Sequence, residues 1–492
     1  MNRIASTVAG ACLIASIGGC AVGPDFKPPA APLSPRYTAE PLAQAARGDE
    51  RVAMQRFVEG QTIPEKWWSL FRSEPLDAMV RQALAANADL EAAQASLRIA
   101  QENVRAQQGA FFPTVGAQFS PTRQSIAPAL ASPVASGGNP YTLHTAQLNI
   151  AYAPDVFGGN RRQSESLQSL SDVQRFQLEA AQLTLTANLV ATVIQRAAVR
   201  AQIDATHDIV ALADSQLSMV RRQQALGQVG VSDVVAQEAL LAQLEATLSP
   251  LQKQQAQQRN QLAVLLGRLP SDAEIPEIGL DALQLPGELP LSLPSQLVAQ
   301  RPDVRAAEAQ WHAANAQIGV ALAARLPSFD LTANVGTTAL RLSQLATAGS
   351  AFWGIGANLM QPLFDAGTLL HRQRAAEATE AQSAAQYRST VLGAFQNVAD
   401  TLNAIEADAA TLAAQNRAEQ AAVRNFDVAR AQRDAGATGS FPVLVAQQAL
   451  RQAALARIQA QSARLADSVA LFQALGGGWS LAAAARGTGP GN

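Results

Sequence analysis

The sequence contains few aromatic and few charged residues, and this composition excludes several classes of protein. Of its 492 residues, 5% are aromatic and 15% are charged, whereas alanine, leucine, glutamine and arginine are abundant. This composition favours long packed helices over a compact α/β enzyme. With a net charge of -2, the chain has no excess of basic residues of the kind that a nucleic-acid-binding surface needs, so we expect no nucleic-acid partner.

Residues for metal, redox and phosphate chemistry are also scarce. The only cysteines are Cys12 and Cys20, and the four histidines lie far apart, without the spacing of a metal site. The sequence has no glycine-rich phosphate-binding loop. Its carboxylates are spread along helical stretches, where charges usually form solvated or paired faces. We therefore expect neither an enzyme nor a resident cofactor.

The N-terminus carries the most specific short motif. Arg3 is followed by an apolar stretch from Ile4 to Ile17 and by small residues before Cys20, which is the pattern of a secretory signal and is too short for a spanning helix. Ile17 to Cys20 resembles the bacterial lipobox, so we predict that residues 1–19 are removed and that Cys20 is acylated. An ordinary signal followed by a chance cysteine is the alternative. Ala21 after the cysteine, by resemblance, favours the outer membrane.

Alternating strands are predicted at matching places in the two halves of the chain. In the clearest one, Phe329, Leu331 and Val335 share a face opposite Asp330 and Asn334. Each run is about the 9 to 11 residues that a tilted membrane strand needs. Four strands cannot close a barrel, and an open edge in lipid leaves backbone groups unpaired. The chain must therefore oligomerise if the strands enter a membrane, with eight strands from two copies or twelve from three. Soluble hairpins packed on a core are the alternative.

An internal duplication organises the whole sequence. "RPDVRAAEAQ" (301–310) matches "NADLEAAQAS" (87–96) at an offset of 214, and the same register aligns Pro113 with Pro327. Each predicted hairpin precedes a helical stretch of nearly 70 residues, which would be roughly 100 Å long. Each half is thus predicted to contain a helix, a β-hairpin, a long helix, a glycine-marked turn and a return helix.

These patterns divide the chain into ten segments. They are a signal peptide (1–19), an extended lipid-anchored segment (20–66), a periplasmic helix (67–113), membrane hairpin 1 (114–154), long helical hairpin 1 (155–266), a proline-rich connector (267–300), a second periplasmic helix (301–327), membrane hairpin 2 (328–362), long helical hairpin 2 (363–475) and a flexible tail (476–492).

Several stretches together resemble the outer-membrane factor family, the exit ducts of tripartite efflux pumps. They are "WWSLFRSEPLDAMVRQALAANADLEAA" (67–93), "FFP" (111–113), "QRPDVRAAEAQ" (300–310), "LPSFDL" (326–331) and "QPLFDAGTL" (361–369). The leading "GCAVGPDFKPP" (19–29) is similar to the lipoprotein branch that works with resistance-nodulation-division drug pumps. The resemblance implies a homotrimer in the outer membrane, in which a long α-helical barrel continues a twelve-stranded transmembrane β-barrel with four strands per subunit. It also implies two partners, a periplasmic membrane-fusion adaptor and an inner-membrane pump.

The resemblance further places the periplasmic tips at the two glycine turns. Family members narrow the pore with acidic residues at the start of the second return helix, where this chain has Pro442 and Val445, so an acidic gate is not expected there. Asp233 is the only acid in either turn, and it is equally explained as a residue favoured at a helix start. The candidate gate and adaptor-contact residues are Gly227, Gly230, Asp233, Gly436, Gly439, Pro442 and Val445.

Two other functions fit part of the pattern. A soluble coiled-coil scaffold held by its lipid would explain the long helices and Cys20, but it would not explain four alternating strands placed by duplication. A protein-secretion conduit would share the architecture, and the lipoprotein motif favours drug efflux over it. The expected function is therefore a trimeric outer-membrane channel that passes drugs or other small toxic compounds to the exterior.

Overall fold

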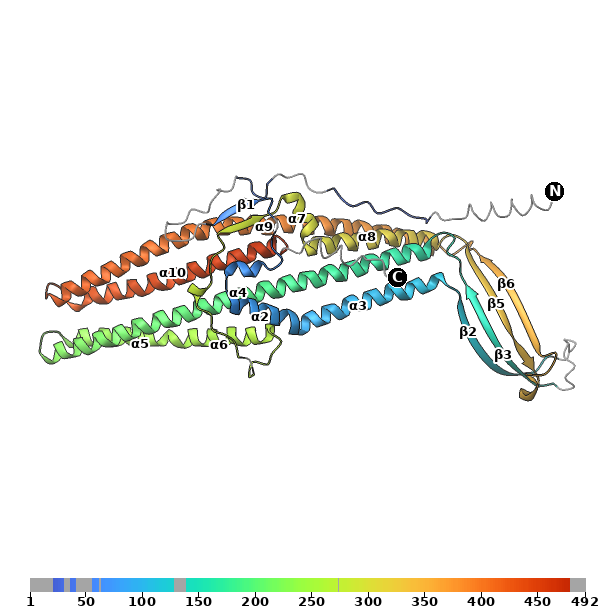
Figure 1. Cartoon of the computed structure of the whole chain (residues 1–492), viewed down its shortest axis with the longest axis horizontal. Helices are drawn as coiled ribbons and strands as arrows, with labels where there is room; N and C mark the ends of the chain where they lie inside the picture. Colours follow the sequence, from blue (N-terminus) through green and yellow to red (C-terminus); the bar gives the residue numbers. More distant parts are fainter. Residues whose placement is uncertain are drawn as a thin grey trace. The chain divides into compact units, whose positions relative to one another are not determined.

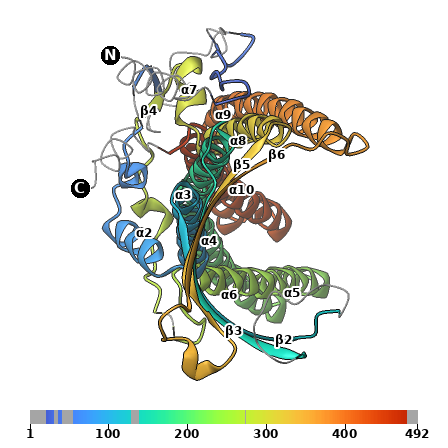
Figure 2. The ribbon, with the colours of Figure 1, turned by 90° about the vertical axis from the view of Figure 1, so that its right-hand side faces the viewer.

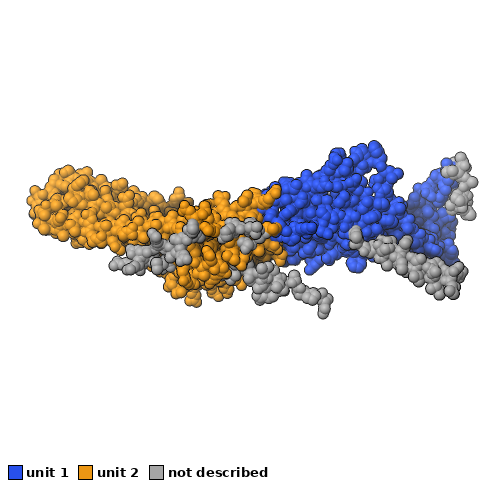
Figure 3. Space-filling view, turned by 90° about the horizontal axis from the view of Figure 1, so that it is seen from above, with its two compact units in different colours: residues 1–29, 96–174, 307–387 blue, residues 30–95, 175–306, 388–492 orange. Residues whose placement is uncertain are grey.

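The structure is a computed structural model, and it describes residues 21–30, 36–40, 55–61, 63–127, 139–272 and 274–477. The chain forms two compact units, which Figure 3 shows in separate colours. Unit 1 contains residues 1–29, 96–174 and 307–387, and unit 2 contains residues 30–95, 175–306 and 388–492. Each unit is therefore assembled from both halves of the duplicated sequence.

A four-stranded antiparallel sheet lies in unit 1. Its strands are β2 (Thr114–Gln124), β3 (Tyr141–Tyr152), β5 (Ser328–Ala339) and β6 (Ala351–Met360), in the order β2-β3-β5-β6. Figures 1 and 2 show these strands side by side in one curved layer. The two hairpins are joined through β3 and β5, where Leu148 lies opposite Val335. The four predicted strands are thus confirmed, and the duplicated hairpins share one sheet.

Both strand-to-helix transitions use the same device, an aspartate that caps the following helix. The Asp155 carboxylate accepts hydrogen bonds from the backbone N–H groups of Asn160 (3.0 Å) and Arg161 (3.0 Å) at the start of α4 (Gly159–Ala225). The Asp365 carboxylate accepts from Leu369 N–H (2.7 Å) at the start of α9 (Thr368–Asp434), and this bond lowers the pKa of Asp365. These bonds satisfy helix N–H groups that have no partner inside the helix.

The helices α4 and α9 are each 67 residues long, as the sequence predicts. The second is followed by a single return helix, α10 (Ser440–Ala474), whereas the first is followed by two, α5 (Val231–Ala246) and α6 (Leu248–Leu265). The predicted return helix of the first half is thus present but divided at Thr247, a residue with φ -79° and ψ -16°. Pro250 explains the division, because proline has no backbone N–H to donate to the carbonyl of Ala246.

The remaining elements are short strands, shorter helices and 3-10 turns. In unit 2, β1 (Arg56–Glu59) pairs in parallel with β4 (Glu288–Leu291), and Trp67 stacks on Phe472 with ring centroids 5.3 Å apart. No helix among the described residues is both long enough and apolar enough to cross a membrane. The other helices are α2 (Glu74–Ala86), α3 (Ala88–Gln108), α7 (Pro294–Gln300) and α8 (Pro302–Ala323), with short 3-10 turns at Trp67–Phe71, Gly109–Phe111, Leu280–Ala282 and Leu342–Gln344.

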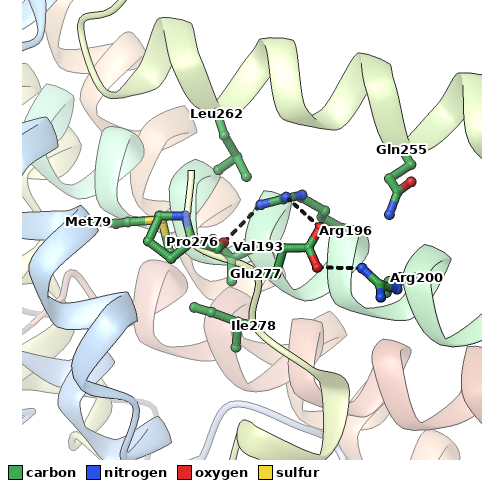
Figure 4. A pocket seen from close by; sticks show the side chains of 9 residues that line it. All are labelled: Met79, Val193, Arg196, Arg200, Gln255, Leu262, Pro276, Glu277 and Ile278. Carbon is green, nitrogen blue, oxygen red and sulfur yellow. Dashed lines mark hydrogen bonds and ion pairs between the residues drawn. The ribbon is translucent and has the colours of Figure 1, made fainter. Parts of the chain in front are cut away.

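The proline-rich connector is attached to α4 by arginines. Arg196 donates a hydrogen bond to the Pro276 carbonyl (3.0 Å), and Arg200 forms an ion pair with Glu277, as Figure 4 shows. The adjoining cavity measures only 20 Å³, about the space of one water molecule. Burial lowers the pKa of Arg196, which the neighbouring Glu277 partly offsets. These arginines attach the connector to α4, and the cavity beside them is too small to bind a substrate.

Candidate functional site

One face of the four-stranded sheet is apolar and strongly exposed in the single chain. Residues that lie directly opposite each other on paired strands share a face, so the register of Val115 with Ile150 and of Val335 with Trp353 defines it. Trp353 is 76% exposed and Ile355 is 80% exposed. The same register places His144 and Arg123 at one end of this face. Its apolar residues include Val115, Ala117, Phe119, Ala146, Leu148, Ile150, Phe329, Leu331, Ala333, Val335, Trp353, Ile355, Ala357 and Leu359.

The opposite face is polar and almost uncharged. Gln147 donates hydrogen bonds to Asn149 (2.9 Å) and to Gln118 (3.4 Å), and Asn149 also donates to Gln118 (3.2 Å). Asp330, which lies opposite Asn358, is the only Asp, Glu, Lys or Arg residue on this face of the described strands. A sheet with one apolar and one polar face is the pattern of a membrane barrel, whose outside meets lipid and whose inside meets water.

Both edges of this sheet are open within the described residues. The sheet ends at β2 on one side and at β6 on the other, and neither outer edge pairs with another described strand. An exposed strand edge presents a row of unpaired N–H and C=O groups, which lipid cannot satisfy. The sheet therefore needs a further strand at each edge before it can enter a membrane.

The predicted tips are two helix turns with the same geometry. Gly227 has φ 74° and Gly436 has φ 73°, the left-handed conformation that glycine adopts most easily. In the first turn, Gln228 N–H donates to the Gln223 carbonyl at 2.9 Å, and in the second turn Ala437 N–H donates to the Gln432 carbonyl at the same distance. Both long helices thus end in a Schellman motif, in which a left-handed glycine stops the helix.

The return helices begin differently in the two turns. Gly230 and Gly439 each precede a return helix, and the Asp233 carboxylate accepts a hydrogen bond from Gly230 N–H at 3.1 Å. Asp233 therefore caps the start of α5. Pro442, three residues after Gly439, has no carboxylate for this role, and Val445 is 47% exposed. The structure thus brings the seven candidate residues together only as two separate turns, each contained in one helical hairpin.

A buried arginine close to the second turn was missed by the sequence analysis. Arg433, whose side chain is 4% exposed, donates hydrogen bonds to Gln216 of α4 (2.6 Å) and to Asp434 (2.7 Å). It therefore links the two long helices within a few residues of Gly436. An arginine in the last turn of a helix suits the helix dipole, but no pattern in the sequence pairs residue 433 with residue 216.

A polar groove lies between α5 and α10 in unit 2. It has a volume of 580 Å³. Its polar lining consists of glutamine amides and of one charged residue, Arg451. The amide side chains that line it are Gln243, Gln448, Gln452 and Gln459.

The segment that follows Cys20 is bound tightly to the rest of unit 1, although Cys20 itself lies outside the described residues. Val22 N–H donates to the Phe157 carbonyl (3.0 Å), and Arg162 of α4 donates to the Val22 carbonyl (3.1 Å). Arg162 also forms ion pairs with Asp25 (2.7 Å) and Glu165 (2.8 Å). Burial would lower the pKa of Arg162, but these hydrogen bonds raise it.

We call residues 21–26 the N-terminal strap, and close packing also holds this segment in place. A Cβ atom on Gly319 of α8 would lie 2.8 Å from the Val22 carbonyl oxygen, so only glycine fits there. Phe26 stacks on His312 with centroids 4.5 Å apart, and His312 is 2.8 Å from Glu165. The strap is therefore held by charge, by backbone hydrogen bonds and by ring stacking.

Comparison with known proteins places these features in one family. The family model described as outer membrane efflux protein matches residues 79–268 and 293–477. The toluene efflux pump outer membrane protein TtgC of Pseudomonas putida is 30% identical over 94% of this chain and 93% of its own length. The pyoverdine export outer membrane protein OpmQ of Pseudomonas aeruginosa is 29% identical over 95% of this chain and 96% of its own length.

Solved structures show the same fold. The outer-membrane channel OprN superposes with a TM-score of 0.83 and 27% identity, covering 94% of this chain and 100% of OprN. The outer membrane protein VceC of Vibrio cholerae superposes with a TM-score of 0.78 and 26% identity, covering 85% of this chain and 100% of VceC. The match therefore extends over the sheet and the long helices alike.

Proposed function

The chain belongs to the outer membrane efflux protein family, and from this membership we propose that three copies form the exit channel of a tripartite pump for drugs or other small toxic compounds. The outer-membrane location and the role in efflux are those of the family, which consists of transport channels and not of enzymes. The expected partners are a periplasmic membrane-fusion adaptor and an inner-membrane resistance-nodulation-division pump. We assign no catalytic step and no resident cofactor to the chain.

The observation that carries the proposal is the amphipathic sheet with two open edges. Pairing β6 of one copy with β2 of the next satisfies both edges and closes a ring. Two copies would give eight strands, whose interior is just wide enough to be filled by side chains. Three copies give twelve strands and leave a lumen, lined by the polar face that contains Gln118, Gln147 and Asn149.

The long helices continue this channel as a helical tunnel, as in the family. Their glycine turns at Gly227 and Gly436 would then be the periplasmic tips, where we place closure and adaptor contact. The tips hold no acidic ring in this proposal, because Asp233 is engaged as a helix cap and Pro442 and Val445 are uncharged. Closure would instead depend on contacts such as the one between Arg433 and Gln216.

The lipid on Cys20 is part of the proposal. The strap holds Val22 beside Phe157, which lies between the end of β3 and the start of α4, so an acyl chain on Cys20 would start close to the apolar sheet. We expect radiolabelled palmitate to be incorporated into the wild-type protein and not into Cys20→Ala. Equal labelling of the two proteins would contradict acylation at Cys20.

A protein-secretion conduit is the alternative, and the relatives favour small molecules. TtgC is described as a toluene efflux protein and OpmQ as a pyoverdine export protein, and both match almost the whole chain. The tunnel architecture alone does not distinguish these cargoes, since both need a continuous water-filled path.

The decisive test is deletion of this protein in a strain that also lacks redundant exit channels. Susceptibility to a panel of antibiotics, dyes and organic solvents should increase several-fold and should be restored by the wild-type chain. Purified protein in detergent should have the mass of three chains. Unchanged susceptibility to every compound, with the inner-membrane pump expressed normally, would count against efflux.

A further inference from the structure

Large apolar side chains are exposed at both edges of the sheet, at the end where the strands meet the helices. After β6, Leu363 is 94% exposed and Phe364 is 90% exposed. Beside the start of β2, Phe112 is 69% exposed and Val115 is 67% exposed. Exposed groups of large apolar side chains mark sites of contact with another protein or with a membrane, so each group calls for a neighbour.

These two groups cannot meet within one chain. The strands β2 and β6 are separated by β3 and β5, and neighbouring strands lie about 4.8 Å apart. The two edges are thus roughly 14 Å apart across the sheet. Whatever covers them must come from outside the chain.

The middle of the sheet shows what such a contact looks like when it is formed. Phe157, which lies between the end of β3 and the start of α4, packs against Phe329, the second residue of β5. Their ring centroids are 6.4 Å apart, and the planes are tilted by 37°. This contact closes the junction between the two hairpins at the level where strands become helices.

The duplication gives the outer edges the same parts. Phe364 lies between the end of β6 and the start of α9, as Phe157 lies between β3 and α4. Val115 is the second residue of β2, as Phe329 is of β5, and the offset of 214 residues that aligns Pro113 with Pro327 also aligns these two. The inner junction is therefore formed within one chain. The corresponding residues at the outer edges, Phe364 and Val115, are exposed and could form a junction of the same kind with another copy.

We propose that Phe364, together with Leu363, packs against Val115 and Phe112 of the next copy of the chain. The contact rests on the proposed closure of a ring by pairing β6 with β2, and it extends that pairing beyond the ends of the strands. In an antiparallel pair, the end of β6 meets the start of β2, which places these side chains side by side. The occupant is a second copy and not lipid, because the same contact at the inner junction is between two protein side chains.

Cross-linking between two distinguishable chains tests the contact directly. One chain carries Phe364→Cys and the other carries Val115→Cys or Phe112→Cys, each with its own affinity tag, and the two are produced together. A short bis-maleimide should give a dimer band that contains both tags. Chains with one substitution alone should give no such band, which also controls for any reaction of Cys20.

Trp353→Cys provides a matched control on the same strand. Trp353 is 76% exposed on the apolar face, but it lies near the opposite end of β6 from Met360. Antiparallel pairing directs it toward the far end of β2, away from Val115. Trp353→Cys with Val115→Cys should therefore give little cross-linked dimer, and a yield equal to that of Phe364→Cys would overturn the proposal as random collision.

A second measurement separates this inference from ring closure itself. Native mass measurement should find fewer intact trimers for Phe364→Ala than for Phe364→Leu, which keeps an apolar side chain. Intact trimers without any cross-link from residue 364 to residues 112 or 115 would overturn the contact and leave the ring. Monomers in the wild-type protein would overturn both.

Discussion

Replacing Arg433 with alanine should destabilise the closed arrangement of the helix turns. Arg433 donates to Gln216 across the two long helices at 2.6 Å, and its side chain is 4% exposed, so water cannot replace the lost donor easily. Gln216 is also buried, and its amide oxygen would be left without this partner. The substitution should therefore remove the hydrogen bond that joins Arg433 of α9 to Gln216 of α4 near Gly436.

The structure gives the size of the effect. A hydrogen bond to a charged group contributes about 1.5 to 3 kcal/mol, and a buried acceptor left unsatisfied costs a similar amount. If the turns separate when the channel opens, losing this bond shifts the equilibrium toward the open state by about 10-fold to 150-fold. The electrical conductance of a largely closed channel should rise accordingly.

Single-channel recording in planar bilayers measures this shift. The open fraction of Arg433→Ala should exceed that of the wild type, and cells that produce it should admit a bulky antibiotic that the wild type excludes. Arg430→Ala is the matched control, because Arg430 lies one turn earlier on α9, has a side chain that is 55% exposed and is 3.9 Å from the same Asp434. Such a surface pair contributes only about 0 to 1 kcal/mol.

The reasoning fails if Arg433→Ala and Arg430→Ala conduct alike. Equal open fractions would mean that the buried link to Gln216 does not hold the closed state. Loss of assembly, seen as monomers in detergent, would show instead that Arg433 is needed for folding, and Arg433→Lys would then be compared with the wild type for conductance.

Three further substitutions should act locally. Arg162→Ala should speed hydrogen exchange in residues 21–26, because it removes three hydrogen bonds to the strap, whereas the exposed Arg105→Ala should not; equal exchange in the two variants would contradict the strap. Burial, reinforced by a hydrogen bond with Asp408, raises the pKa of Asp467 to about 7, so its contribution to stability is present in acid and is lost as pH rises through about 7. The unfolding temperature should therefore fall progressively between about pH 4 and pH 7, and Asp467→Asn should remove that fall; an unchanged slope would refute the assignment. Asp233→Ala should destabilise the first turn by about 1 kcal/mol, seen as faster exchange at Gly230, while Asp233→Asn keeps an acceptor and should exchange almost like the wild type.

Local patterns in the sequence predicted most of the fold. The alternation around Phe329 and Leu331 predicted a strand, because successive side chains of a strand point to opposite faces. Glycines at 227 and 436 predicted the ends of the long helices, because a left-handed residue is easiest for glycine. The same reasoning placed the candidate tip residues in two turns, and it identified Asp233 as a possible cap.

Long-range contacts were beyond such patterns. The proline at position 250 was not taken as a helix break, although its effect is local. Arg162 and Arg433 gave no signal, because their partners lie 137 and 217 residues away in the chain. The parallel pairing of β1 with β4 was missed because the two strands lie far apart in the sequence. Each strand also has only four residues, which is too few for a clear alternating pattern.

The sequence by itself determined that the chain is duplicated, that it has two long helices and four alternating strands, and that it resembles one family of channels. Periodicity and repetition follow from neighbouring residues, so they can be read along the chain. The tertiary structure alone decided that the hairpins join through β3 and β5, which leaves β2 and β6 at the edges. Strand order depends on contacts between residues far apart in sequence, and it is this order that leaves Phe364 and Val115 exposed for another copy.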